Sequence, residues 1–403
     1  MITVQRADIT KDNLQLGARA AKVTWLAGAI GLVAIAAAVL LGLLSSDGGE
    51  SFATAYLTAF VFFLTLALGA LFFVLLQHVT GAGWGVVVRR PAEAIAGVFP
   101  LFAVLSIPLL FNLHSIYPWA GGEAASDHVL AGKAAYLNVP FFLIRWIAYF
   151  GIWSLMASYF RRTSARQDGS GDPALTIKME RLSAPGMVVF ALTATFFSFD
   201  VLMSRDPHWY STIYGVYLFS GSVVGFCAVL PLLTLSLQRW GRIQHAVTRE
   251  HYHDLGKLTF AFVVFWAYIA FSQFMLMWYS NIPEETSWYL RRLSGPWSGF
   301  SLILLLGHFV IPFWLLISRG VKRRPATLAF AASWVLLMHL LDVYWLTMPE
   351  SSPTSLGFSL MHVLCLAGVG ALMIAAVTYN LSRSALIPVG DPRLDESLSF
   401  ENV

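Results

Sequence analysis

Ten apolar stretches, each long enough to cross a lipid bilayer, constrain this chain more than any other feature of its sequence. Crossing the hydrocarbon core as an α-helix takes roughly 20 apolar residues. Only 12% of the 403 residues are charged, which is about half the charged fraction of an average soluble domain. The sequence therefore predicts an all-α polytopic membrane protein. The expected spans cover residues 23–44, 52–79, 92–111, 134–160, 182–202, 212–237, 258–278, 300–317, 327–348 and 358–379.

The distribution of basic residues tests this count and gives an orientation. Lys and Arg collect in the cytoplasmic loops of membrane proteins. With the N-terminus placed inside, 21 of the 26 basic residues fall in segments expected to be cytoplasmic, and only Arg145 lies within a span. A miscount by one span would mix the two groups of loops. The sequence therefore predicts ten helices with both termini in the cytoplasm, and it gives no reason to expect a nucleic-acid partner.

The segments between the spans are short, so no soluble catalytic domain is expected. No small-residue cleavage site follows the first apolar stretch, so no removable signal peptide is expected. Cys227 and Cys365 each stand alone in an apolar run, which excludes the CxxC spacing of an iron–sulfur or zinc site. The polar tail is expected to lie along a partner or to be mobile. The longest loops, of about twenty residues, are expected near 112–133, 161–181, 238–257 and 279–299.

The second to fifth spans resemble the sixth to ninth. Asp200 and Asp342 are each followed by valine and, a few residues later, by proline, and Pro140 aligns with Pro312. Such a repeat matters because sites in membrane proteins often form at the interface between repeats. Four helices in each unit would make the two units parallel and predict two four-helix bundles. A chance match between apolar segments is the alternative. The expected units are a cytoplasmic segment 1–22, a peripheral helix 23–51, bundles 52–211 and 212–357, a peripheral helix 358–379 and a cytoplasmic tail 380–403.

Several ionisable or strongly polar side chains fall within or beside the expected spans. A charge at the bilayer centre costs about 2.5–3.5 kcal/mol on insertion scales, so such residues normally face the bundle interior and mark an ion, proton or ligand path. His339 and Asp342 stand three residues apart in an apolar run and therefore share one helix face. By depth, the set comprises Gln77, His78 and Glu93 toward the cytoplasm, Arg145 near the middle, Asp200, Gln273, His308, His339 and Asp342 in the outer half, and His114 and His362 at the outer boundary.

Each of these groups also has a structural explanation. Side chains near helix ends, such as His78, can reach the membrane surface. Glu93 lies near a helix start, where a carboxylate interacts favourably with the helix dipole. Arg145 paired with an aspartate would form a neutral network.

Three kinds of chemistry could use the set. Haem ligation needs two histidines that face one cavity, which His308 and His339 could supply, although no second pair lies at an equivalent inner depth. Intramembrane hydrolysis could use Asp200 and Asp342 as a catalytic pair, but neither aspartate has the glycine-rich neighbourhood of aspartyl proteases. Proton relay or quinone binding needs only titratable groups in a wet cavity with aromatic walls, and this interpretation fits best. The aromatic candidates are Trp266, Tyr268, Phe271, Tyr344 and Trp345.

Four segments carry a resemblance that covers essentially the whole chain. They are H-V-T-G-A-G-W-G-V-V-V-R-R-P-A-E (78–93), F-D-V-L-M-S-R-D-P-H-W-Y-S-T-I-Y-G-V-Y (199–217), F-S-Q-F-M-L-M-W-Y-S-N-I-P-E-E (271–285) and P-V-G-D-P-R-L-D-E-S-L (388–398). Together they are similar to the NrfD/PsrC-type membrane subunits. Within that family the chain resembles the shorter, ActF-type subunit of bacterial alternative complex III, also called quinone-binding subunit 2.

The resemblance implies two four-helix bundles in the cytoplasmic membrane of a bacterium, within a quinol:electron acceptor oxidoreductase that reduces cytochrome c or a similar acceptor. The iron–sulfur clusters and c-type haems would belong to partners: the longer sister subunit, an iron–sulfur protein and c-type cytochromes. The resemblance implies that this chain itself binds no cofactor, although a quinone is possible. Membrane lipids and the quinone pool would be among its partners. The quinol site is best associated with the longer sister subunit, and no quinone ligand can be matched in this chain.

The predicted role is therefore a scaffold and candidate proton half-channel, with no catalytic residue and no metal ligand. An independent ion or small-molecule transporter, and a membrane cytochrome b that uses His308 and His339, are the alternatives. The outer part of the path would comprise Asp200, His308, His339 and Asp342, with Gln273 at similar depth, Arg145 tuning the carboxylates, and Glu93 with His78 at the cytoplasmic intake.

Overall fold

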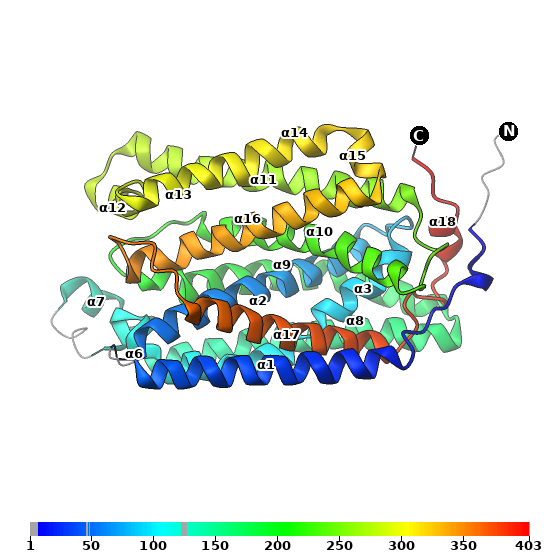
Figure 1. Ribbon diagram of the computed structural model, residues 1–403, viewed down its shortest axis with the longest axis horizontal. Helices are drawn as coiled ribbons and strands as arrows, with labels where there is room; N and C mark the ends of the chain where they lie inside the picture. The colour runs from blue at the N-terminus through cyan, green and yellow to red at the C-terminus, as the bar shows by residue number, and fades with distance from the viewer. Residues whose placement is uncertain (1–6, 46, 48, 122–126, 403) are drawn as a thin grey trace.

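The computed structural model describes residues 7–45, 47, 49–121 and 127–402, so parts of the expected segments 1–22, 23–51 and 380–403 and of the loop 112–133 lie outside the described residues. Within these ranges ten helices are long and apolar enough to span a membrane, and they run side by side (Figure 1). The chain is an all-α polytopic membrane protein, as predicted. The spans are α1 (Arg19–Leu44), α2 (Glu50–Val79), Val86–Phe111, α8 (Val139–Ser170), α9 (Pro173–Val201), α10 (Tyr214–Arg239), α11 (Arg249–Ser280), Pro296–Ile317, α16 (Pro325–Ser351) and α17 (Leu360–Ser382).

Both chain termini lie at one end of the bundle, here called the terminal end, and the opposite end is called the far end (Figure 1). An even number of spans requires this arrangement. Which side of the membrane the terminal end faces stays a prediction. Short elements cap the two ends, namely η1 (Ile9–Lys11), α15 (Arg319–Arg323) and α18 (Leu394–Leu398) at the terminal end, and α6 (Leu113–Ile116), η2 (Pro118–Ala120), α7 (His128–Lys133), η4 (Met203–Arg205) and α12 (Pro283–Arg292) at the far end.

Prolines interrupt two of the spans. The third span consists of α3 (Val86–Ala96), α4 (Phe99–Leu105) and α5 (Ile107–Phe111), and a proline stands in the first turn of α4 and of α5. Proline is tolerated there because its missing N–H would have no helical partner. The eighth span consists of α13 (Pro296–Leu304), the π-helical turn η5 (Leu305–Val310) and α14 (Ile311–Ile317). Pro312 cannot donate to the carbonyl of His308 four residues earlier, which accounts for the wider turn at His308.

Two of the loops expected from the sequence are mostly helical. The expected loop 161–181 is wrong: α8 continues to Ser170 and α9 begins at Pro173. Gly171 turns the chain in the left-handed conformation, and the carboxylate of Asp172 caps α9 by accepting from the N–H of Ala174. Likewise α11 already begins at Arg249, within the expected loop 238–257. Charged side chains outside the bilayer do not end a helix, so hydropathy alone underestimates helix length.

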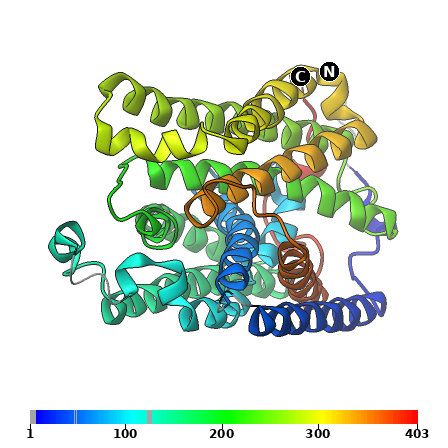
Figure 2. The same ribbon diagram turned by 60° about the vertical axis from the view of Figure 1, so that its left-hand side comes forward.

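The central helix is α2, which is buried along nearly its whole length. It packs on α10 more extensively than on α3 or α9, while α17 covers another of its faces and α1 packs on α17 at the edge of the molecule (Figure 2). The helices α11, α13 and α14 form the opposite edge. The division into bundles 52–211 and 212–357 with two peripheral helices stays a prediction, because α2 and α10 join the two groups along a continuous core.

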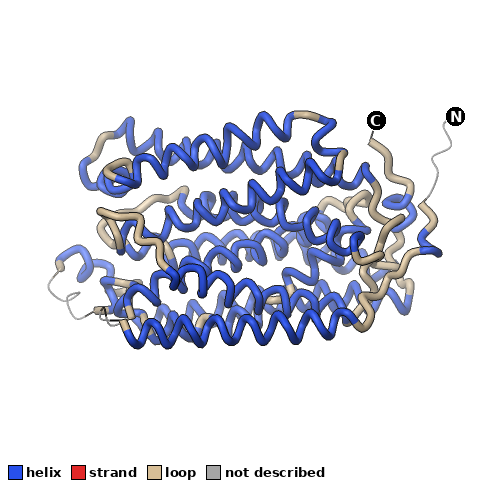
Figure 3. The backbone as a smooth tube through the Cα atoms, viewed as in Figure 1, coloured by secondary structure: helices blue, strands red, loops and turns tan. Residues whose placement is uncertain are grey.

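The C-terminal tail packs on its own chain, contrary to the expectation that it lies along a partner or is mobile. Leu386, Ile387 and Leu398 are buried, and Ser397 Oγ donates to the carbonyl of Trp84. The tail carries apolar residues between its polar ones, so it can bury part of its length. Figure 3 shows the described parts of the tail and of the N-terminal segment mostly as loop, each with one short helix, across the terminal end.

Replacing Gly69 by alanine tests the close approach of α2 and α10. A Cβ at Gly69 would stand 2.3 Å from the backbone oxygen of Ser222, so the two helices would have to separate. We expect G69A to lower the free energy of unfolding in detergent by about 1–3 kcal/mol. The matched control is G28A on α1, where a Cβ meets nothing within 4 Å. Equal unfolding of G69A and the wild type in denaturant would contradict the close contact.

Candidate functional site

The two aspartates that the predicted internal repeat aligns have different surroundings. Asp200 is buried, and Arg145 donates to both of its oxygens, from Nε at 2.8 Å and from Nη2 at 2.9 Å. Tyr149 Oη donates to the same carboxylate at 2.6 Å. Such a two-bond pair between a guanidinium and a carboxylate is strong and geometrically fixed. The charge of Asp200 is therefore matched within the chain, as the structural explanation for Arg145 anticipated.

Tyr136, in the segment before α8, completes the surroundings of Arg145. Its carbonyl accepts from Arg145 Nη1 at 3.0 Å, and its ring lies 3.8 Å from the guanidinium carbon. Burial, together with the charge of Asp200, raises the pKa of the Tyr136 hydroxyl to about 12. The Tyr136 hydroxyl therefore stays neutral at physiological pH, and the Arg145 pair has no competing anion there.

Asp342 is buried without an ion-pair partner among the described residues. Its Oδ1 accepts from Tyr217 Oη at 2.6 Å, and its Oδ2 accepts from Trp266 Nε1 at 3.0 Å. Both donors are neutral groups, contributed by α10 and α11. A buried carboxylate held only by neutral donors has a much smaller electrostatic preference for its charged form than one held by a guanidinium.

His339 lies one helical turn before Asp342 and is equally buried. Its Nε2 is joined to Thr65 Oγ1 by a hydrogen bond of 2.8 Å, and Thr65 Oγ1 donates its single proton to the carbonyl of Phe62 at 2.6 Å. His339 Nε2 must therefore carry the proton in that bond. Nδ1 of the neutral ring is then an acceptor, and it has no partner among the described residues.

Glycines on α10 make room for this ring. The point where a Cβ on Gly221 would stand lies 3.5 Å from His339 Nδ1 and 3.6 Å from Asp342 Oδ2. A Cβ on Gly225 would lie 2.5 Å from His339 Cδ2. Gly225 thus allows the close packing of the imidazole, and Gly221 lies against both ionisable groups.

His308 stands in the π-helical turn and is fully buried. Its ring centroid lies 3.9 Å from that of Trp266 and 6.4 Å from that of His339. Neither of its ring nitrogens has a hydrogen-bond partner among the described residues. An unpaired buried polar group is costly, and π-helical turns are frequent at functional sites. We call Tyr217, Trp266, His308, His339 and Asp342 the Asp342 cluster.

An aromatic cavity of about 620 Å³ adjoins the Asp342 cluster. Tyr217 and Trp266 belong to its wall, so their polar atoms connect the wall to Asp342. Tyr268, Phe271 and Leu305 line it and are each more than half exposed, so the cavity opens on the membrane-facing surface between α11 and η5. Of the aromatic residues proposed from the sequence, Trp266, Tyr268, Phe271 and Trp345 line this cavity and Tyr344 does not.

Gln273 is bonded to a residue of the cavity wall rather than to the carboxylate. Its Nε2 donates to Tyr289 Oη at 3.2 Å, and its Oε1 accepts from Ser211 Oγ at 3.4 Å. Tyr289 lines the cavity, and burial raises the pKa of its hydroxyl, which therefore stays protonated. Gln273 thus orients a hydroxyl in the cavity wall.

The predicted residues at the terminal end form a separate group. Glu93 lies between Arg89 at 3.3 Å and Arg90 at 3.2 Å, and Arg89 also pairs with Asp391 of the tail at 2.5 Å. His78 packs on Phe160 with ring centroids 5.2 Å apart. Among the described residues no hydrogen bond joins this group to the Asp342 cluster. Glu93 is therefore part of a balanced ion-pair network beneath the tail.

Threonines on α2 are functional candidates that the sequence reasoning missed. Thr58 Oγ1 lies 2.7 Å from Thr347 Oγ1, and Thr54 Oγ1 lies 3.2 Å from Ser351 Oγ. With Thr65 on His339, these hydroxyls mark a polar seam between α2 and α16. Their spacing of four and seven residues places Thr54, Thr58 and Thr65 on one helix face, a pattern that was visible in the sequence.

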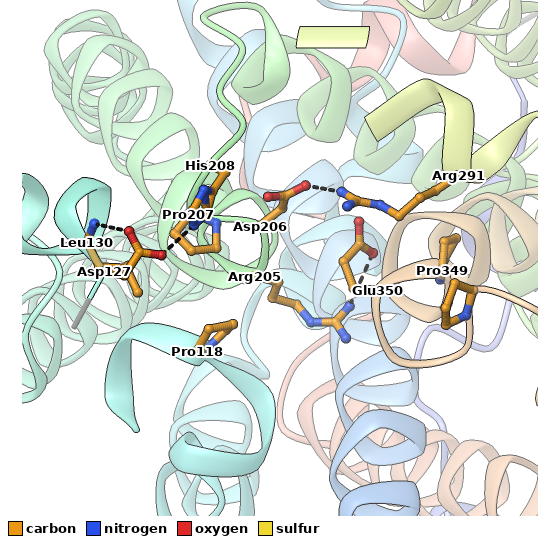
Figure 4. A pocket seen from close by; sticks show the side chains of 11 residues that line it. Pro118, Asp127, Leu130, Arg205, Asp206, Pro207, His208, Arg291, Pro349 and Glu350 are labelled. Atoms are coloured by element: carbon orange, nitrogen blue, oxygen red, sulfur yellow. Dashed lines mark hydrogen bonds and ion pairs between the residues drawn. The ribbon is translucent and has the colours of Figure 1, made fainter. Parts of the chain in front are cut away.

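The seam ends at a polar pocket of about 720 Å³ at the far end (Figure 4). Arg205 donates to Ser351 Oγ at 2.8 Å and to the carbonyl of Thr347, which links the pocket to the seam. Figure 4 shows Arg205 and Glu350 facing each other, with Asp206 paired to Arg291 beside them. The far end is thus an open, charged vestibule, unlike the covered terminal end.

A scan against protein-family models finds no match for this chain, and a search among curated proteins finds no relative. The fold and the site define its class: a multi-pass helical membrane protein with a buried ionisable cluster beside a membrane-open cavity.

Replacing Arg145 by glutamine tests the ion pair with Asp200. The variant would leave a buried carboxylate with Tyr149 as its remaining donor, so we expect a loss of about 3–5 kcal/mol in the free energy of unfolding. The double variant R145Q/D200N should recover much of that loss, because no charge is then left unpaired. Denaturant unfolding in detergent measures all three proteins. Wild-type stability of R145Q alone would show that the pair is not formed.

Proposed function

We propose that this chain is a membrane subunit of a quinol:electron acceptor oxidoreductase of the alternative complex III type, in the cytoplasmic membrane of a bacterium. In that assembly it is a scaffold and a proton half-channel, and both of its termini face the cytoplasm. One observation carries the proposal: a buried carboxylate and two histidines, with no cationic partner among the described residues, lie beside an aromatic cavity that opens to the membrane.

The hydrogen bonds of Asp342 suit proton transfer. Trp266 Nε1 can only donate, so it holds Oδ2 as an acceptor in both protonation states. Tyr217 Oη can donate or accept, so its hydroxyl can reverse when Oδ1 takes up a proton. The proton is therefore expected at Oδ1, on the side of Tyr217 and the cavity.

His339 extends the proposed path from the carboxylate of Asp342. His339 Nδ1 is an acceptor without a partner among the described residues, and both it and Asp342 Oδ2 lie within 4 Å of the Cβ position of Gly221. We propose that one water molecule joins the two groups there. Beyond His339, Thr65 begins the seam of hydroxyls that leads toward the far-end pocket. About two helical turns of α2 separate Thr65 from Thr58, so the seam needs water between them.

The cavity suits a flat lipophilic ring. Its volume lies within the usual range for small-molecule sites, its walls are mostly aromatic and aliphatic, and its hydroxyl-bearing lining residues are Tyr217, Tyr268, Tyr289 and Ser301. A quinone from the membrane pool is the ligand we propose. A bound quinol would present its hydroxyl to Tyr217 and so to Asp342.

Other predicted residues support the scaffold more than the path. A path through Asp200 would have to break its two bonds to Arg145, and one through Glu93 would have to compete with two arginines. We propose that iron–sulfur clusters and c-type haems lie in partner subunits, namely the longer sister subunit, an iron–sulfur protein and c-type cytochromes.

Two alternatives have direct tests. An independent transporter would purify alone, whereas a complex subunit would purify with haem-bearing partners. A cytochrome b built on His308 and His339 would give a haem spectrum in the isolated chain. Beside those two rings, Trp266 packs on His308 at 3.9 Å, and Gly225 is in close contact with His339, so this chain's own atoms fill much of the space.

Asp342→Asn tests the proton path in the purified complex, reconstituted in proteoliposomes. Asparagine keeps an oxygen for hydrogen bonding but cannot carry the proton, so we expect proton release to fall while the complex stays assembled. G221A should also lower proton release, because its methyl group would stand 3.5 Å from His339 Nδ1 and 3.6 Å from Asp342 Oδ2 and would exclude the bridging water molecule.

The matched control for this experiment is D172N in the α8–α9 turn. Asp172 is exposed, and asparagine caps a helix as well as aspartate does. The control should leave turnover and proton release unchanged. Unchanged proton release in D342N would remove Asp342 from any path.

Ala270→Trp tests the quinone cavity. Ala270 lines the cavity, so the indole would occupy the space of the ring, and we expect the quinone content of the purified complex to fall. Extraction and mass spectrometry measure that content. A261W is the control, because Ala261 lies on the same helix, is exposed and does not line the cavity. Equal quinone content in A270W and A261W would place any bound quinone elsewhere.

A further inference from the structure

A second apolar groove lies on the opposite flank of the molecule, between α10 and α17. It has a volume of about 390 Å³, and α2 forms its floor through Phe62, Phe63 and Leu66. Ile374 and Trp240 line it and are partly exposed, so the groove opens to the surrounding membrane. It shares no lining residue with the aromatic cavity.

The groove has the length of one membrane leaflet. Along α10 it extends from residue 229 to residue 240, and along α17 from residue 370 to residue 381. At 1.5 Å per residue each wall is about 16 Å long. The hydrocarbon core of a bilayer is about 30 Å thick, so one leaflet contributes about 15 Å. The deep end lies near the middle of both helices, and the shallow end lies at the terminal end.

The N-terminal residues 12–16, here called the strap, cover the shallow end of the groove. Leu16 of this strap is buried and lines the groove. The strap is held on one side by Asp12, which accepts from the backbone N–H groups of His245 and Ala246. On the other side the carbonyl of Leu14 accepts from the N–H of Leu386 at 2.8 Å. The groove is thus closed toward the aqueous side by fixed chain.

Basic side chains surround this closed end. Arg242 Nη2 donates to the carbonyl of Leu16 at 3.2 Å, which places its guanidinium at the end of the groove. Arg19 and Lys22 are exposed in the first turn of α1, next to Val23 of the groove wall. None of these three side chains forms an ion pair with a carboxylate in the part of the chain that the structure describes. Trp240 lies at the same level, where indoles favour the headgroup region.

We propose that this groove binds one acyl chain of an anionic phospholipid, with its phosphate beside Arg242, Arg19 and Lys22. An apolar groove as long as one leaflet is deep fits an acyl chain. The three cations, which have no paired carboxylate among the described residues, favour a headgroup with net negative charge. Basic pockets between membrane helices bind such lipids by the same combination. The site is independent of the proposed proton path.

Native mass spectrometry of the delipidated full-length protein tests the proposal. The protein is given phosphatidylglycerol and phosphatidylcholine in equal amounts, and bound lipid is counted. The wild type should retain phosphatidylglycerol in preference to phosphatidylcholine. The variant R19Q/K22Q/R242Q should lose at least tenfold in phosphatidylglycerol affinity. R242Q alone carries the test if the triple variant does not fold.

Two matched controls separate the groove from general electrostatic attraction. R162Q/R166Q/K178Q removes the same charge from exposed residues of α8 and α9 and should keep the lipid. L233W fills the groove and should lose the lipid, whereas L232W, one residue away and outside the lining, should keep it. Equal binding of the two lipids by the wild type, equal loss in the two triple variants, or full binding by L233W would each overturn the proposal.

Discussion

A carboxylate inside a membrane-spanning bundle must find its hydrogen bonds within the protein, because the surrounding hydrocarbon offers none. This chain meets the requirement in two ways, at the two aspartates that the predicted repeat aligns. Asp200 receives a guanidinium and a phenol, which pair it with a cation and fix its orientation. Asp342 receives a phenol and an indole, which orient it without neutralising its charge. The difference between a cationic and a neutral donor separates the structural aspartate from the candidate functional one.

The central helix α2 gives the Asp342 cluster its rigidity. Gly69 brings α2 against α10, and Thr65 on α2 fixes the tautomer of His339. The ring of His339 in turn fits against Gly225 of α10. The helices α2, α10 and α16 therefore determine the orientation of the His339 ring. In this orientation Nδ1 has no partner among the described residues. The far-end pocket and the hydroxyl seam extend from this rigid centre along α16.

The two ends and the two flanks of the molecule differ in ways that fit distinct roles. At the terminal end the tail and the N-terminal strap cover the helices, with Arg89 and Asp391 joined beneath them. At the far end a charged pocket is open. One flank carries an aromatic cavity beside the Asp342 cluster, and the other carries an apolar groove next to basic side chains. A lipophilic ring and a phospholipid chain would thus bind on opposite sides of the same core.

The sequence by itself determined the ten spans, the shared side of the two termini and the burial of His339 and Asp342, because hydropathy and helical spacing are local properties. It could not determine what these residues contact. Tyr217 and Trp266 lie 125 and 76 residues before Asp342 along the chain, and nothing in their local sequence marks them as its donors. The wide turn at His308 and the burial of the tail likewise depend on packing between distant segments. The hydropathy of the surrounding span indicated that these aspartates are buried. Only the tertiary structure decided that Asp200 is paired with a cation while Asp342 has no cationic partner among the described residues.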